Sequence, residues 1–329
     1  MKVLVTTVPF ADKDRRPLDL LDKVGAEVVI NPLGRKLKNA DLLELISDVD
    51  ILIAGTELLT DQVLDKAASL KLIARVGIGL DSVDLLAARG RGIEVCYTPD
   101  APSPAVAELT IGLMLNLLRA VQVSNQRMHQ GKWFRYYGWR LSEVTIGIIG
   151  AGRIGSQVIR HLAGFDCSRI LVNDVDSSLV LPSHPSCSIE RSEKDTIYRE
   201  ADIISIHVPL TAQTRNLVSR IEISCMKPGT LLINTARGGI INEQNLFDAL
   251  ESGHLGGAAI DVFEEEPYGG NLTTLDRCLL TAHMGSMSVD CRARMEVEAA
   301  EEAVRFISGK PLQSVVPEEE YDNQRLPSS

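Results

Sequence analysis

Short apolar runs alternate with helical segments along most of the chain. In the first hundred residues these runs are KVLVTT, AEVVIN, DILIAG, KLIARV and IEVCYT. From Val144 onward a second series contains TIGIIG, ILVND, IISIHVP, GTLLINTA, GGAAIDVF and CLLTAH. Such alternation predicts parallel strands that are buried on both faces and joined by right-handed crossovers. The pattern therefore predicts two α/β domains, each built on a doubly wound parallel sheet.

A proline-rich stretch and a long helix separate the two series. Residues 99–104 contain three prolines, which cannot continue a helix or an inner strand, so we expect a hinge there. A helix is predicted from Ala105 to about Gln130. Its apolar residues lie on more than one side, which predicts packing against two surfaces, one of them on a second subunit. A further helix, about 289–307, is expected to return to the first domain, and the acidic tail 318–329 is predicted to be disordered.

Both tryptophans of the chain lie in the segment Lys132–Arg140, together with one phenylalanine and two tyrosines. Aromatic density of this kind is typical of subunit contacts. Alternatively, these side chains anchor the segment beneath its own domain. The segment is therefore a candidate dimerisation arm, with loop anchoring as the alternative.

Composition and charge argue against several classes of protein. The chain has 329 residues and a formal net charge of −10, so it offers no basic surface for nucleic acid or anionic lipid. The apolar run at the amino terminus is too short for a signal sequence, and no apolar run is long enough for a membrane span. The six cysteines show no metal-binding spacing, which predicts reduced thiols, no metal and a cytoplasmic protein.

A glycine motif opens the second series. TIGIIGAGRIG places Gly150, Gly152 and Gly155 between an apolar strand and a helix. In this context the first glycine allows a tight turn, the second lets the backbone approach a pyrophosphate, and the third allows close helix packing. The next strand ends in Asp174, which is placed to bind a ribose diol and to repel a 2′-phosphate. The motif predicts a dinucleotide site that favours NAD over NADP; the alternative for Asp174 is a helix cap.

Chemically active side chains follow the later strands of this series. They are His207, Arg237, Asp261, Glu266 and His283. Oxidation of a hydroxy acid needs a cation to hold its carboxylate, a base to take the hydroxyl proton, and a carboxylate to orient the base. Arg237, His283 and Glu266 can take these roles in that order.

Each of these residues also has a structural interpretation. The histidines can be structural hydrogen-bonding groups, and Glu266 can belong to a solvated run of acids. Asp261 can cap a turn, and Arg237 can form an internal ion pair. The set as a whole is more specific than any one member.

With these residues the chain resembles the NAD-dependent D-isomer-specific 2-hydroxyacid dehydrogenases, and within them the D-3-phosphoglycerate dehydrogenases. The resemblance covers almost the whole chain and rests on the blocks RVGIGLDSVDL, TIGIIGAGRIG, HVPLTAQTRNLV, MKPGTLLINTARGGIINE, AAIDVFEEEP and TAHMGS. It implies that Arg237 binds the substrate carboxylate and that His283, paired with Glu266, is the acid–base.

The resemblance also implies binding residues. On the substrate side these are Arg75, the backbone amides of Val76 and Gly77, and Arg135, which would act across a dimer. The implied cofactor-binding residues are Ile78, Gly150, Gly152, Arg153, Ile154, Gly155, Asp174, Val208, Pro209, Thr214, Thr235, Ala236, Asp261 and Gly285.

The implied architecture is a flavodoxin-like substrate domain, 1–99 plus 289–329, and an inserted Rossmann domain, 100–288, that binds NAD. The cleft between them would close by a hinge motion, and the helix from Ala105 with the aromatic arm would form a homodimer. The partner molecule would be a 2-hydroxy or 2-oxo acid.

The chain departs from the phosphoglycerate dehydrogenase pattern at one place. An arginine–serine pair expected after DILI is replaced by Ala54-Gly55, and Glu57 adds negative charge nearby. A lost guanidinium forfeits about 1.5–3 kcal/mol of phosphate binding. Glyoxylate or hydroxypyruvate reduction is therefore an alternative to 3-phosphoglycerate oxidation. An NAD-sensing corepressor-like protein is the rival from another class, because such proteins keep the catalytic residues.

Overall fold

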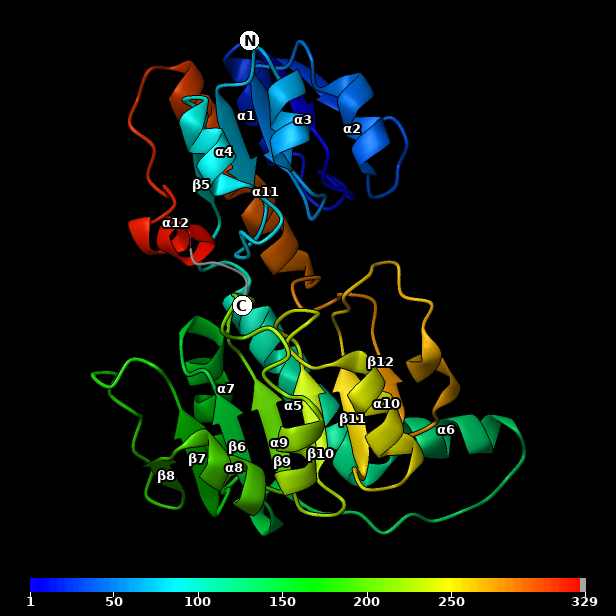
Figure 1. Cartoon of the computed structure of the whole chain (residues 1–329). Coiled ribbons are helices and arrows are strands. Elements are labelled where there is room, and N and C mark those ends of the chain that lie inside the picture. The colour runs from blue at the N-terminus through cyan, green and yellow to red at the C-terminus, as the bar shows by residue number, and fades with distance from the viewer. Residues whose placement is uncertain (326–329) are drawn as a thin grey trace. The chain divides into compact units, whose positions relative to one another are not determined.

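The computed structural model describes residues 1–325 and divides into two compact units. The first contains Met1–Pro102 and the chain from Ser286 onward, and the second contains Ser103–Gly285. Each unit is a sheet of exclusively parallel strand pairs with helices packed against it (Figure 1). The predicted class of two doubly wound α/β domains is confirmed.

The first unit has the strand order β2-β1-β3-β4-β5, which is the flavodoxin-like order. Helix α11, which follows the second unit in the sequence, packs against α1, β3 and β4. The elements are β1 (Lys2–Val5), α1 (Arg16–Lys23), β2 (Glu27–Ile30), α2 (Asn39–Leu45), β3 (Ile51–Ala54), α3 (Asp61–Lys66), β4 (Leu72–Arg75), α4 (Leu85–Gly90), β5 (Glu94–Tyr97), α11 (Val289–Ile307) and α12 (Glu318–Arg325).

The second unit has the order β12-β11-β10-β9-β6-β7-β8, in which the sequence reverses direction between β6 and β9, as in Rossmann folds. The elements are α5 (Ser103–Arg119), α6 (Val121–His129), η1 (Leu141–Glu143), β6 (Thr145–Ile149), α7 (Arg153–Ala163), β7 (Arg169–Asn173), β8 (Ser188–Arg191), α8 (Lys194–Glu200), β9 (Ile203–Ile206), α9 (Arg220–Cys225), β10 (Leu231–Asn234), α10 (Glu243–Glu251), β11 (Gly257–Ile260), η2 (Asn271–Thr274) and β12 (Cys278–Leu280).

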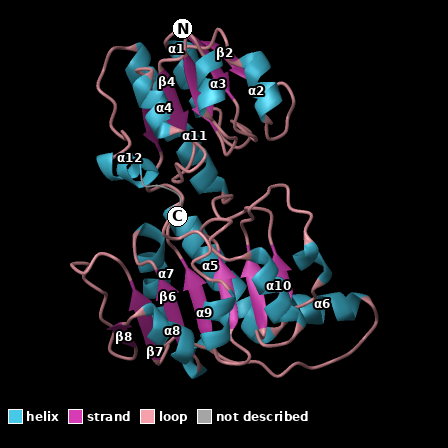
Figure 2. Cartoon of the chain, in the orientation of Figure 1, coloured by secondary structure: helices cyan, strands magenta, loops and turns pink. Residues whose placement is uncertain are grey.

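The second sheet is covered by helices on both faces (Figure 2). Adjacent residues Leu232 and Ile233 of β10 are both fully buried, yet they pack into different apolar clusters. One cluster includes residues of α8, α9 and α10, and the other includes residues of α5 and α7. Because successive side chains of a strand point to opposite faces, a strand covered on both sides is apolar throughout. This explains the unbroken apolar runs of the sequence.

The prediction of one helix from Ala105 to Gln130 is wrong, because the chain bends by 64° between α5 and α6. Ala120 takes a left-handed conformation with φ of 49°. The side chain of Asn116 then accepts a hydrogen bond of 3.0 Å from the backbone of Gln122 in the first turn of α6. Among the described residues no single helix is long and apolar enough to cross a membrane; only α5 and α6 taken together pass by length and composition.

The prediction of a disordered tail is wrong for residues 318–325, which form α12; residues 326–329 lie outside the described part. The helix packs on α4. Arg89 of α4 donates two hydrogen bonds of 2.7 Å to Glu318 and lies 3.3 Å from the ring centre of Tyr321. Gln324 accepts from the backbone of Leu85 and donates to the carbonyl of Val83. These tertiary contacts order a segment whose composition alone indicates disorder.

The aromatic segment Lys132–Arg140 has no helix or strand. Four of its five aromatic side chains are exposed, among them Trp133 at 75% and Trp139 at 62% of full exposure, whereas Tyr136 is half-buried and contacts Phe134. Anchoring of the aromatic rings beneath their own domain, the alternative considered above, is therefore wrong for the four exposed side chains. Their part in a subunit contact stays a prediction.

Candidate active site

A histidine and a glutamate form a hydrogen-bonded pair beyond the ends of β11 and β12. The Nδ1 atom of His283 lies 3.0 Å from both carboxylate oxygens of Glu266. The two side chains are 33% and 19% exposed. A carboxylate can only accept, so Nδ1 carries the proton and Nε2 of the neutral ring is left with a lone pair. The pair is arranged to take up or release a proton at Nε2.

The turn that carries His283 is held by Asp261, whose side chain is 1% exposed. Its carboxylate accepts hydrogen bonds from the hydroxyl of Thr281 at 2.6 Å and from the backbone of Met284 and Gly285 at 2.7 and 2.8 Å. His283 itself donates its backbone N–H to the carbonyl of Asp261 and has a left-handed φ of 51°. Such a conformation costs on the order of 1–3 kcal/mol unless its surroundings hold it.

These contacts bear on two residues predicted to bind the cofactor. The Asp261 carboxylate already has three donors, and the backbone N–H of Gly285 points to it. The alternative that Asp261 caps a turn agrees with this geometry. A direct cofactor contact by either residue stays a prediction.

Arg237 follows β10, the strand beside β11, so it shares the carboxyl edge of the sheet with the His283–Glu266 pair. Its Nη1 donates to the carbonyl of Ala236 at 2.7 Å, and its side chain is half-buried. The buried amide of Asn234 shapes the turn, because it accepts from the N–H of Ala236 and donates to the carbonyl of Arg237. Asn234 was not singled out from the sequence, although a polar residue that ends a buried strand is a usable signal.

Gly238 brings the Arg237 turn against the loop that leads to Glu266. A Cβ at Gly238 would lie 2.0 Å from the carbonyl carbon of Phe263 and 2.5 Å from the backbone nitrogen of Glu264. Only glycine permits that approach. The structure therefore gathers Arg237, Glu266 and His283 at the ends of three neighbouring strands.

The glycine motif forms a cradle between β6 and α7. A Cβ at Gly155 would meet the carbonyl oxygen of Gly150 at 2.0 Å, and Gly150 itself has φ of 92° and lies against the backbone of His207. Gly152 differs, because a Cβ there would meet nothing within 4 Å. The first and third glycines thus allow tight packing, and the second faces open space at the start of an eleven-residue helix. This arrangement fits the pyrophosphate of a dinucleotide.

Asp174 is bound to the same loop. Its Oδ2 accepts from the backbone of Ala151 at 2.6 Å and its Oδ1 from the backbone of Asp176 at 2.9 Å. An ionised carboxylate offers about four acceptor sites, so two donors leave capacity for a ribose diol. The side chain is half-buried.

Several other predicted cofactor residues lie around this cradle. Arg153 and Ile154 start α7, and Val208 and Pro209 follow β9. The hydroxyl of Thr214 donates to the carbonyl of Pro209 at 2.6 Å and so closes the turn that carries them. The hydroxyls of Thr235 and Thr110, which lies on α5, are 2.9 Å apart, and Ala236 is buried beside them.

His207 is not equivalent to His283. Its ring is half-buried, with Nε2 2.9 Å from the hydroxyl of Ser205, and its buried Nδ1 has no hydrogen-bond partner within residues 1–325. Burial lowers its pKa to about 4, which keeps the ring neutral at physiological pH. This favours the structural interpretation of His207.

The predicted substrate residues Arg75, Val76 and Gly77 belong to the first unit, whereas Arg135 lies in the exposed aromatic segment of the second. Ile78, which was predicted to bind the cofactor, also belongs to the first unit, and its cofactor contact stays a prediction. Arg75 is buried and donates to the carbonyl of Val76. The N–H of Val76 donates to Ala54, and the N–H of Gly77 to the hydroxyl of Thr98 at 2.7 Å. Both amides thus have acceptors within their own unit, and their binding of a carboxylate stays a prediction.

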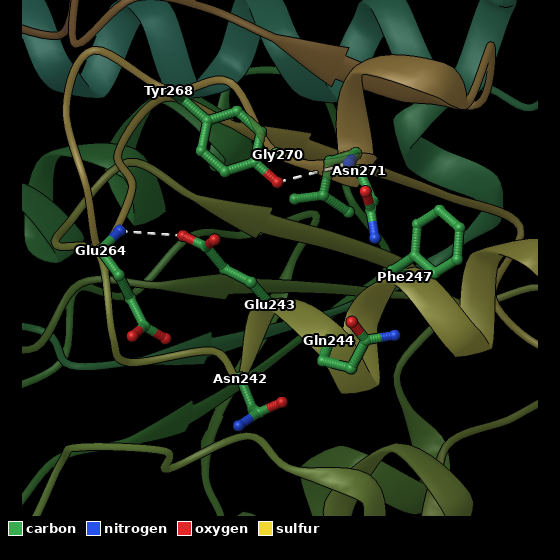
Figure 3. Close-up of a pocket in the computed structure, with 9 residues that line it drawn as sticks. Asn242, Glu243, Gln244, Phe247, Glu264, Tyr268, Gly270 and Asn271 are labelled. Atoms are coloured by element: carbon green, nitrogen blue, oxygen red, sulfur yellow. Dashed lines mark hydrogen bonds between the residues drawn. The ribbon is translucent and has the colours of Figure 1, made fainter.

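A cavity of about 360 Å³ lies between the start of α10 and the loop 264–272 (Figure 3). Glu243 accepts there from the backbone of Glu264 at 2.8 Å, and its partial burial raises its pKa. The other lining residues are Asn242, Gln244, Phe247, Tyr268, Gly270, Asn271 and Leu272. The cavity contains none of the predicted site residues, although its loop begins two residues before Glu266.

Comparison with known proteins gives consistent results. Residues 111–285 match the family model described as D-isomer specific 2-hydroxyacid dehydrogenase, NAD binding domain. The chain is 36% identical over 324 residues to D-3-phosphoglycerate dehydrogenase of Methanocaldococcus jannaschii, which covers 96% of this chain but only 59% of that protein. It is 35% identical over 295 residues to hydroxypyruvate reductase of Thermotoga maritima, covering 86% of this chain and 94% of that protein.

Among solved structures, the TT0316 protein from Thermus thermophilus superposes with a TM-score of 0.85 and 34% identity. The match covers 96% of this chain and all of that chain. The similarity therefore extends through both units and is not limited to the glycine motif.

Proposed function

The chain belongs to the D-isomer-specific 2-hydroxyacid dehydrogenase family, and on that premise we propose that it transfers a hydride between NAD and a D-2-hydroxy acid/2-oxo acid pair. The observation that carries the proposal is the His283–Glu266 pair at the strand edge that also holds Arg237. A base, its orienting carboxylate and a cation at one edge are the groups that this reaction needs. NAD is the cofactor, in agreement with the family model and the cradle at Gly152.

In the oxidative direction Arg237 holds the carboxylate of the acid through charge-assisted hydrogen bonds. Nε2 of His283 takes the proton of the C2 hydroxyl as the C–O bond becomes a carbonyl. NAD, when bound, supplies the acceptor for the hydride that leaves C2. Glu266 stabilises the resulting imidazolium, and reduction of a 2-oxo acid uses the same groups in reverse.

Asp174 and the glycine cradle are the groups that would hold the dinucleotide, and the acid at Asp174 favours NAD over NADP. We assign substrate binding to the first unit, through Arg75, Val76 and Gly77, and cofactor binding to the second. We also propose a cytoplasmic homodimer in which α5 and the exposed aromatic segment meet the partner.

The experiment is a turnover assay. The protein is incubated with NAD and D-2-hydroxy acids, or with NADH and the 2-oxo acids, and nicotinamide absorbance is followed. We expect turnover of at least one D-acid and a much slower rate with its L-enantiomer. Absence of turnover with every acid in both directions would favour the NAD-sensing alternative.

A further inference from the structure

Glu57 is a buried carboxylate at the carboxyl edge of the first sheet. Its side chain is 2% exposed and follows β3 by three residues. Both of its oxygens accept from the backbone N–H of Gly55, at 3.0 and 3.1 Å, and Oε1 also accepts from the hydroxyl of Thr6. A Cβ at Gly55 would lie 2.9 Å from Glu57 Oε2 and 3.1 Å from Thr7 Cα, so glycine is needed for this close approach.

Glu57 lies close to the point at which the strand order of the first sheet reverses. In the order β2-β1-β3-β4-β5 the topology reverses between β1 and β3, and ligands of such sheets bind at the carboxyl ends of strands around that point. Thr6 directly follows β1, and Gly55 directly follows β3. Glu57 therefore lies at the ligand-binding point of the first unit.

The same edge carries the segment assigned to the substrate carboxylate. Ala54 of β3 is paired in register with Arg75 of β4, and its carbonyl accepts from the N–H of Val76 at 2.9 Å. With the assignment of substrate binding made above, an acid held at Arg75–Gly77 would have its remaining substituents near the neighbouring strand ends. The charge on those substituents would then interact with the groups at the carboxyl end of β3.

Backbone N–H groups and hydroxyls at such an edge ordinarily bind anionic groups of ligands. Here the N–H of Gly55 and the hydroxyl of Thr6 are taken by the chain's own carboxylate. A second anion at this point would find these donors in use and would face a like charge in a poorly screened environment. A hydroxyl or other uncharged polar group would meet no such repulsion.

We propose, as an extension of the function above, that Glu57 determines substrate specificity. It selects 2-hydroxy and 2-oxo acids whose side chain is uncharged and rejects those that carry a phosphate or a second carboxylate.

The test compares kcat/KM for D-glycerate and 3-phospho-D-glycerate, which differ only at the C3 oxygen. D-lactate and D-malate form a second pair with a neutral and an anionic side chain. We expect the wild type to prefer the uncharged acid of each pair by at least about tenfold. Glu57→Gln should reduce that preference at least about tenfold, mainly through a lower KM for the anionic acid, with kcat for the uncharged acid little changed. A tenfold change corresponds to about 1.4 kcal/mol.

Asp50→Asn is the matched control. Asp50 immediately precedes the same strand, β3, at its amino end, and it also accepts a backbone hydrogen bond, from Lys2 at 2.9 Å. Its replacement removes the same charge and should leave the preference unchanged. Glu57→Asp keeps the charge and should keep the preference, and it serves with the wild type if Glu57→Gln does not fold.

A wild type that prefers the anionic acids would overturn the assignment, and so would an equal loss of preference in Glu57→Gln and Asp50→Asn. Failure of the proposed function has a different signature. In that case no acid of either pair, and no acid of the wider panel, would be turned over by any variant.

Discussion

The His283→Ala variant is expected to turn over its acid about 10²- to 10⁴-fold more slowly than the wild type. The reason is that Nε2 of His283 is the group proposed to move the hydroxyl proton. The other ring nitrogen, Nδ1, lies 3.0 Å from Glu266, which orients the ring. NAD affinity, measured by titration of protein fluorescence, should change little because the cradle at Gly152 does not involve this ring. The Glu266→Gln variant should also turn over its acid more slowly, since a neutral amide stabilises an imidazolium less well than a carboxylate does.

His161→Ala is a suitable control because His161 is an exposed residue of α7 in the same unit. It should leave kcat and KM unchanged. A loss of about tenfold or less in His283→Ala would mean that His283 is a structural histidine.

The second large effect is expected at Arg237. Removal of one partner of a buried, hydrogen-bonded charge pair costs about 2–5 kcal/mol, so Arg237→Ala should lower kcat/KM for the acid by about 30- to 5,000-fold. NAD affinity should stay within about twofold, because the loss concerns the acid. Arg237→Lys should recover only part of the loss, since a lysine keeps the charge but not the planar fork that binds a carboxylate through two hydrogen bonds.

Arg220→Ala provides the comparison for Arg237. Arg220 is exposed and interacts with Asp248 at 3.5 Å, so its removal should not affect kinetics. Normal turnover in Arg237→Ala, or equal losses of NAD and acid affinity, would refute the role assigned to Arg237.

The fold could be predicted from the sequence because its strands are buried on both faces. Runs such as Leu231–Asn234 are apolar throughout and are separated by helical segments, which is typical of parallel sheets. The edge strand β8 escaped prediction because Ser188–Arg191 is polar and only partly buried. The bend at Ala120 and the helix α12 escaped it because they depend on the cap from Asn116 and on the contact between Arg89 and Tyr321. Local patterns do not contain such contacts.

The candidate site, too, could be predicted from the sequence only in part. Spacing and position after strands were sufficient to select Gly150, Arg237, Glu266 and His283. The closeness of Glu266 and His283 also requires the left-handed turn held by Asp261, which follows a different strand from the one that leads to His283. Likewise, a glycine is needed at position 238 because the backbone there lies against Phe263, which is distant in the sequence. The N–H of Gly55 donates to the side chain of Glu57, which folds back on it. These contacts form only in the folded chain, so a single sequence does not reveal them.

The most direct measurement of the central claim uses a D-2-hydroxy acid that carries deuterium at C2. If the protein transfers a hydride from C2 to NAD, mass spectrometry of the NADH formed will show one deuterium per turnover and none in the solvent. Deuterium in the water, or NADH that contains only hydrogen, would contradict direct transfer and with it the proposed function.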